Sequence, residues 1–171
     1  MKKEQAVKVE RQSPVSTAEP GPGDIILSGT YDIDIDWIKH PVFDAHIDGP
    51  FQLDVFMDGT TGTWWAKFNW AMLDGIIKMD PGPTYETATN FHTLGWRIRN
   101  VDTGKLTFGR NCTGKISFDE ETRTLEGYLY DVPEAGRIDF QGDRVLGPRR
   151  VGDLSREWDR FVEQAYGATR Y

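Results

Sequence analysis

TTGTWWAKFNWAMLDGIIKM, residues 60–79, is the stretch that decides the fold. From Trp64 to Trp70, apolar side chains occupy every second position: Trp64, Ala66, Phe68 and Trp70. The positions between them hold Trp65, Lys67, Asn69 and Ala71. A period of two is typical of a β-strand, so the two sets are expected on opposite faces. After a turn near Ala71 and Met72, the alternation continues through Leu73, Gly75, Ile77 and Met79. The stretch therefore predicts two adjoining strands whose aromatic face needs a core to cover it.

The size and composition of the chain fit one domain with a dense core. The chain has 171 residues, which is enough for a single domain with a real hydrophobic core. Aromatic residues make up 12% of it, a high share that suits a tightly packed β core. The net charge of −7 argues against nucleic acid and against an anionic membrane surface as partners, because both are usually met by basic surfaces.

Three features of the sequence indicate its compartment. No apolar run approaches the roughly 20 residues that span a bilayer, and the N-terminal segment lacks the apolar region of a secretory signal. The one cysteine, Cys112, excludes an intrachain disulfide and fits a reducing compartment. We therefore expect an intracellular, cytoplasmic protein with no membrane partner.

The composition of the chain changes after residue 23. Residues 1–23 are polar, contain three prolines and show no aliphatic pattern. Segments of this kind bury too little apolar surface to fold. We predict a disordered N-terminal arm at 1–23, followed by a single β-barrel domain at 24–171.

Further short strands are predicted wherever the alternation returns: 27–37, 51–57, 91–100, 112–118, 123–130 and 137–145. Asp58-Gly59 is a strong hairpin signal after the second of these. Glycine recurs inside the strands, where a strongly bent barrel strand uses it for close backbone approach. The pattern predicts a mainly β fold: an antiparallel up-and-down barrel of eight to nine strands, calycin- or lipocalin-like, whose closure removes exposed edges.

From Asp153 onward the spacing of apolar residues becomes that of an amphipathic helix. Asp153 or Ser155 can cap its N-terminus, and Gly167 stands where a C-terminal glycine is common. One C-terminal α-helix is therefore expected over 153–167. Its apolar stripe either lies against the barrel, on the outer wall or over one mouth, or meets a partner chain. The second arrangement would allow a homodimer through the helix, and the barrel wall is another surface for one.

Several short motifs resemble a group of uncharacterised fungal proteins. These motifs are the W-R-x-R run Trp96-Arg97-Ile98-Arg99, the strand Cys112-Thr113-Gly114-Lys115-Ile116, the opening Ser28-Gly29-Thr30-Tyr31 and the helix start Glu157-Trp158-Asp159. The resemblance covers residues 26–171 and implies a shared small, calycin-like β-barrel and an intracellular fungal origin. Ile98 stands where the group has glycine. The resemblance implies no activity.

The aromatic inner face of the expected barrel is the first candidate site. It comprises Tyr31, Trp37, Trp64, Phe68, Trp70, Leu94 and Trp96, with His92 on the same face near a strand end. Barrels of about eight strands either hold one small ligand or fill their interior with side chains. Both interpretations stay open: a cavity for a small hydrophobic or aromatic ligand, or a solid core made by the same residues.

Arg97 and Arg99 form a second candidate site, on the opposite face of the same strand as Trp96. If that face were the inner one, the two arginines would mark a site for an anionic ligand, since guanidinium groups bind carboxylate and phosphate bidentately. A slip of one residue in register would exchange the two faces. Tryptophan and leucine belong inside more readily than arginine, so outward salt bridges to the acidic strands are favoured.

No catalytic or metal-binding motif stands out, and no cofactor is expected. The histidines lack the spacing of a metal site: His40, His46 and His92. Asp32, Asp34 and Asp36 alternate as the solvated face of a strand and lack the offsets of a calcium loop. Cys112 has no basic neighbour in sequence to lower its pKa, so a buried, inert thiol is expected.

Three functions remain compatible with these patterns. The first is a non-enzymatic protein that holds a small hydrophobic or aromatic ligand in the barrel. The second is a structural or protein-interaction module with a filled barrel, which would use the C-terminal helix or the barrel wall, with a contribution from exposed aromatics such as Trp65, Tyr128 or Tyr130. The third is a small barrel isomerase or cyclase with His92, Tyr31 or an inward carboxylate as the acid–base group. The enzyme has the least support, because no paired catalytic motif accompanies those residues.

Overall fold

The structure, a computed structural model, describes residues 27–35, 51–84, 86–147 and 153–169. The elements of these residues are β2 (Gly29–Ile35), β3 (Phe51–Met57), β4 (Trp64–Trp70), β5 (Leu73–Met79), β6 (His92–Asn100), β7 (Leu106–Thr107), β8 (Thr113–Asp119), β9 (Thr124–Val132), β10 (Gly136–Leu146) and α1 (Leu154–Thr169). The predicted arm at 1–23 lies outside the described residues, as do Trp37, His40 and His46.

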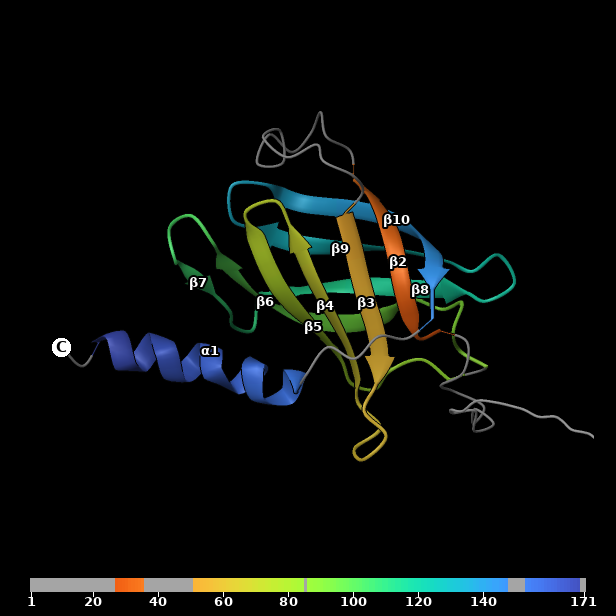
Figure 1. Cartoon of the computed structure of the whole chain (residues 1–171), viewed down its shortest axis with the longest axis horizontal. Helices are drawn as coiled ribbons and strands as arrows, with labels where there is room; N and C mark the ends of the chain where they lie inside the picture. Colours follow the sequence, from red (N-terminus) through yellow and green to blue (C-terminus); the bar gives the residue numbers. More distant parts are fainter. Residues whose placement is uncertain (1–26, 36–50, 85, 148–152, 170–171) are drawn as a thin grey trace, which may run out of the picture.

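Eight of these strands close into an antiparallel barrel (Figure 1). Each barrel strand pairs with the next one along the chain, and the last, β10, returns to pair with β2, where Phe140 lies opposite Ile35. The pairing of β5 with β6 completes the ring, with Ile77 opposite Trp96. A closed ring leaves no barrel strand with an open edge. The predicted up-and-down barrel with one C-terminal helix is confirmed.

The ninth strand, β7, is a short addition beside β6. β8 pairs with β6 from His92 to Gly95, and β7 pairs with the same strand further along, at Ile98 and Arg99. Between them, the Trp96 backbone N–H donates to the carbonyl oxygen of Cys112 at 3.0 Å. β7 and β8 therefore act as one interrupted neighbour of β6. The predicted number of strands, eight to nine, depends on whether β7 is counted as a separate strand.

The stretch 60–79 forms β4 and β5, as its alternation predicts. Phe68 lies opposite Leu53 on one side and opposite Gly75 on the other, so its set of side chains faces the barrel core. The turn between the strands falls at Ala71, which adopts the left-handed conformation with φ of 58°. A positive φ matches the twist that a tight hairpin requires.

The loop after β3 differs from the tight turn expected at Asp58-Gly59. The chain leaves the ladder over residues 58–63, and the Asp58 N–H donates to the carbonyl oxygen of Thr63. The left-handed residue is Gly62, with φ of 77°, rather than Gly59. The Asp58 carboxylate accepts the backbone N–H of Thr60 at 2.8 Å, as aspartate often does in turns. A wider loop is the result.

α1 lies along the outer wall of the barrel rather than over a mouth (Figure 1). The Oδ1 atom of Asp153 accepts the backbone N–H of Arg156 at 3.1 Å and so caps its first turn. Gly167 lies inside the helix, which ends at Thr169 and is therefore slightly longer than expected. None of the helices among the described residues has the length and apolar character needed to cross a bilayer.

A second, smaller core joins the helix to the wall. Its buried members are Trp65 and Ile76 from the strands and Leu154 and Phe161 from the helix. The expectation of an exposed Trp65 is wrong: this side chain points out of the barrel, but α1 covers it and leaves it 4% exposed. The apolar stripe of the helix is thus used within the chain.

Candidate functional site

Six of the predicted interior residues meet inside the barrel: Tyr31, Trp64, Phe68, Trp70, Leu94 and Trp96. All six are between 0% and 2% exposed. A cavity large enough for water would expose part of any side chain that lines it. The space next to these six residues is therefore filled by other side chains.

Three of the buried aromatic residues, Tyr31, Trp70 and Trp96, have their polar side-chain atom paired with the backbone. The Nε1 atom of Trp70 donates to the carbonyl oxygen of Gln52 at 2.9 Å, and that of Trp96 donates to Thr113 at 3.1 Å. The Tyr31 hydroxyl donates to the carbonyl oxygen of Leu27 at 2.7 Å. Buried indole and phenol groups are stable when their polar atom has such a partner. These rings therefore need no ligand to satisfy them.

Contacts between rings show how closely the interior is packed. The ring centroids of Phe68 and Trp70 are 4.3 Å apart, and those of Trp70 and Phe140 are 5.4 Å apart. Gly75 faces this cluster, and a Cβ atom there would lie 2.2 Å from the Phe68 ring. Close approach, one of the reasons for glycine in barrel strands, is thus realised here. Around these residues the interior is a solid core.

His92 and Tyr31, the two acid–base candidates, hold structural contacts. His92 is half-buried at the first position of β6, and its Nε2 atom lies 2.8 Å from the carbonyl oxygen of Thr87, to which it donates. Burial raises the pKa of Tyr31 to about 12, because the phenolate is costly in apolar surroundings, while the charge of Arg144 opposes the shift. A phenol with this pKa keeps its proton near neutral pH and does not suit a general base.

Arg97 and Arg99 lie on the outer face of β6, against α1. The Arg97 guanidinium donates to the carbonyl oxygen of Trp158, and its central carbon lies 4.1 Å from the centroid of that ring. Arg99 donates to the side chain of Gln164 and lies 5.4 Å from the centroid of the Phe161 ring. Desolvation lowers the pKa of Arg97. Both arginines point out of the barrel, as the favoured alternative from the sequence expected. Their partners, however, are groups of α1 and not the acidic strands.

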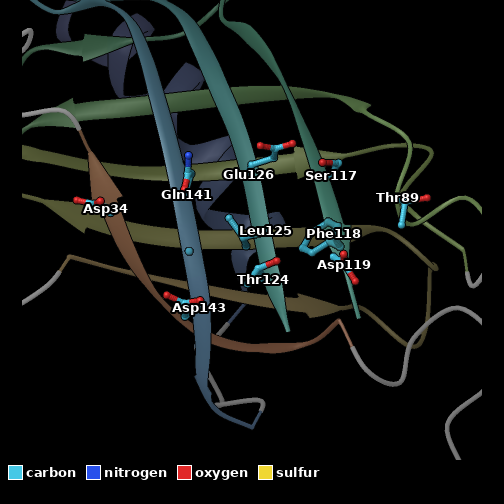
Figure 2. A pocket seen from close by; sticks show the side chains of 11 residues that line it. Asp34, Thr89, Ser117, Phe118, Asp119, Thr124, Leu125, Glu126, Gln141 and Asp143 are labelled. Carbon is cyan, nitrogen blue, oxygen red and sulfur yellow. The ribbon is translucent and has the colours of Figure 1, made fainter. Parts of the chain in front are cut away.

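A pocket opens on the outer wall of the barrel over β8, β9 and β10 (Figure 2). Its volume is about 430 Å³. Strand register arranges its polar side chains in two rows across the strands. The first row is Asp34, Gln141, Glu126 and Ser117, and the second is Asp143, Thr124 and Asp119. Residues from four strands thus converge on one concave surface.

The pocket is anionic. Its lining includes the carboxylates of Asp34, Asp119, Glu126 and Asp143, and no lysine or arginine is among the described residues that line it. Within the described ranges, none of these four carboxylates forms an ion pair. Asp119 is used in part by its own turn, since it accepts the backbone N–H groups of the next residues at 3.0 and 3.3 Å. The other three carboxylates are exposed and available.

Ser117 is the unusual member of the lining. It is 7% exposed, although its neighbours in the same row are exposed. The Phe118 N–H donates to the carbonyl oxygen of Ala88 at 2.9 Å and so holds the segment before β6, which includes Thr89, against β8. Across the part of the chain that the structure describes, the Ser117 hydroxyl has no hydrogen-bond partner. A buried hydroxyl without a partner costs about 1–3 kcal/mol, so this group suits a bound ligand.

Other chemistry finds little support in the described residues. No three histidine, cysteine, aspartate or glutamate side chains among them form a group that could hold a metal ion. Cys112 is a buried free thiol, and burial raises its pKa, as expected for an inert cysteine. In comparisons with known proteins, no family model, no curated protein and no solved structure matches the chain.

Proposed function

We propose that the protein is a non-enzymatic binding protein whose filled barrel is a rigid scaffold and whose site is the pocket on the outer wall. The observation that carries the proposal is the convergence of unpaired carboxylates and one buried hydroxyl on a concave surface. Pockets of about 300–1,000 Å³ are typical of small-molecule sites. The proposal develops the filled-barrel alternative and, of its two surfaces, chooses the wall, over β8, β9 and β10, instead of the helix.

A hydrophobic ligand inside the barrel, the first hypothesis from the sequence, requires Trp64, Trp70 and Trp96 to move apart. Each of these is at most 2% exposed. Two of them would lose hydrogen bonds to backbone carbonyls, and separation would cost roughly 25 cal/mol for each Å² of apolar surface that meets water. This cost is the reason for placing the site outside the barrel.

A thermal-shift titration with benzene separates the two hypotheses. Benzene is expected to leave the melting temperature of the wild-type chain unchanged. Phe68→Ala is the positive control, since loss of this ring leaves an apolar cavity beside Gly75, and engineered cavities of this kind bind benzene. Leu53→Ala supplies a smaller cavity if the first variant does not fold. Stabilisation of the wild type equal to that of the cavity variants would overturn the proposal.

Chemical-shift mapping with a library of small fragments then locates the site. Backbone amides of β8, β9 and β10 around Glu126 are expected to shift upon binding. Shifts concentrated at residues of the barrel core, such as Phe68 or Trp96, would contradict the proposed placement.

Three further expectations continue as proposals. Kinship with the fungal W-R-x-R group and with calycins rests on the motifs around Trp96, and an intracellular location rests on the free thiol of Cys112. A homodimer is the third, and the barrel wall is its better surface because the apolar stripe of α1 is already covered. Sedimentation of the purified chain tests the dimer.

A further inference from the structure

We propose that the pocket on the outer wall binds a small organic cation with two or more primary ammonium groups, a linear aliphatic polyamine. This inference rests on the proposed function, because it names the ligand class of the same site. Three observations carry it: the charge of the lining, the buried hydroxyl, and the distance over which the carboxylates are spread.

The charge of the lining selects a cation. Asp34, Glu126 and Asp143 face the pocket without an ion-pair partner among the described residues. Asp143 also lies directly opposite Asp32 in the ladder between β10 and β2. Like charges at directly opposed positions of a sheet destabilise it. A bound cation would relieve this repulsion, and the net charge of −7 attracts cations to the molecule as a whole.

Ser117 selects a ligand that donates hydrogen bonds. Its hydroxyl is buried, lines the pocket and lacks a partner among the residues that the structure describes. Glu126 lies opposite it in the ladder, so an oxygen acceptor and a carboxylate stand side by side, with Thr89 on the other side of Ser117 (Figure 2). An ammonium group has three N–H donors and can bond both acceptors at once. Hydrogen bonds of this charge-assisted kind are short and strong.

The spread of the carboxylates selects an extended ligand. Asp34 and Glu126 lie in the same row on either side of β10. Neighbouring strands are about 4.8 Å apart, which puts the backbones that carry these residues roughly 10 Å from each other. No three histidine, cysteine, aspartate or glutamate side chains within the described ranges form a group that could hold a metal ion. Two ammonium groups joined by a flexible aliphatic chain can bridge this distance.

Calorimetric titration of the full chain at low ionic strength tests the inference, with putrescine and spermidine as probes. Both are expected to bind saturably at one site, spermidine more tightly, and added salt is expected to weaken binding because the carboxylates are exposed. Butylamine, which has one ammonium group, is expected to bind at least tenfold more weakly than putrescine. Equal affinities for putrescine and butylamine would overturn the inference.

Variants assign the binding to the pocket. Glu126→Gln and Ser117→Ala are each expected to weaken spermidine binding about tenfold, since each removes an acceptor of the ammonium group. Glu163→Gln, the same change of charge on the exposed face of α1, is the matched control and is expected to bind as the wild type does. Asp34→Asn replaces Ser117→Ala if the buried substitution unfolds the chain. If the control variant loses spermidine binding, or if every pocket variant keeps it, the assignment of binding to this pocket is overturned.

Two competing ligands complete the experiment. Calcium chloride that displaces spermidine at equal concentration would show a metal site instead. A lysine-rich peptide that binds tightly while putrescine and spermidine do not would show a protein partner. If no amine binds and benzene leaves the wild type unchanged, only this inference fails. If benzene enters the barrel, the proposed function fails whatever the amines do.

Discussion

Tyr31 makes part of the stability depend on alkaline pH. Its folded pKa, about 12, lies above the unfolded value of about 10, so the contribution is fully present below pH 10. It is lost as the pH rises through 12. The difference of two between the folded and unfolded pKa values corresponds to about 3 kcal/mol of stability in all. Urea denaturation of the wild type and Tyr31→Phe between pH 9 and pH 12 measures it. Because the variant has no phenol at this position, its free energy of unfolding relative to that of the wild type should rise by about 2 kcal/mol over this range. Parallel pH profiles would contradict this assignment.

Ala71 carries a conformational cost that glycine would remove. Its φ of 58° lies in the left-handed region, which costs an L-residue about 1–2 kcal/mol. Glycine loses more backbone entropy on folding, so the net gain expected for Ala71→Gly is about 0.5 kcal/mol, measured by urea denaturation. Ala66→Gly in the preceding strand, β4, is the control, since Ala66 has no positive φ and its substitution should destabilise the chain.

At the scale of elements, Trp158 fastens α1 to the barrel. It contacts Trp65 with 5.8 Å between ring centroids and stacks on the Arg97 guanidinium. Full burial of tryptophan is worth about 3–5 kcal/mol, and this residue is half-buried, so Trp158→Ala should lower the free energy of unfolding by about 2 kcal/mol. Equilibrium urea denaturation checks it. Glu163→Ala on the exposed side of the helix should change little, and equal losses for both would show that helix propensity matters more than docking.

Local patterns made most elements predictable. The alternation around Phe68 and the helical spacing around Trp158 depend only on nearby residues, so both elements and the aromatic inner face follow from the sequence. The pocket on the outer wall does not follow from the sequence. Asp34, Ser117 and Glu126 become neighbours only through the register of four strands, and by sequence alone Asp34 belongs to a solvated face. The same holds for Trp65, whose burial depends on where α1 docks.

For the whole molecule, the two cores predict two levels of stability. The barrel core is one continuous cluster that includes residues of every barrel strand, whereas α1 is held by a small cluster around Trp65. Small units can open without global unfolding. In native-state hydrogen exchange, amides of β4 and β5 should exchange only by global unfolding. Amides of α1 should exchange faster, with a lower free energy of opening. Equal protection of the helix and these strands would show that the two cores unfold together.

The pairing of β10 with β2 also constrains how the chain is made. Phe140 and Ile35 are neighbours in the barrel, although nearly the whole domain separates them along the chain. Contacts between such distant residues slow folding. During synthesis, β2 leaves the ribosome long before β10, its second partner strand, has been made. A nascent chain that ends before Gly136 therefore carries two open sheet edges and an uncovered aromatic core. Such a chain is expected to need a chaperone. Without one, it should aggregate through its open edges and not fold into a smaller barrel.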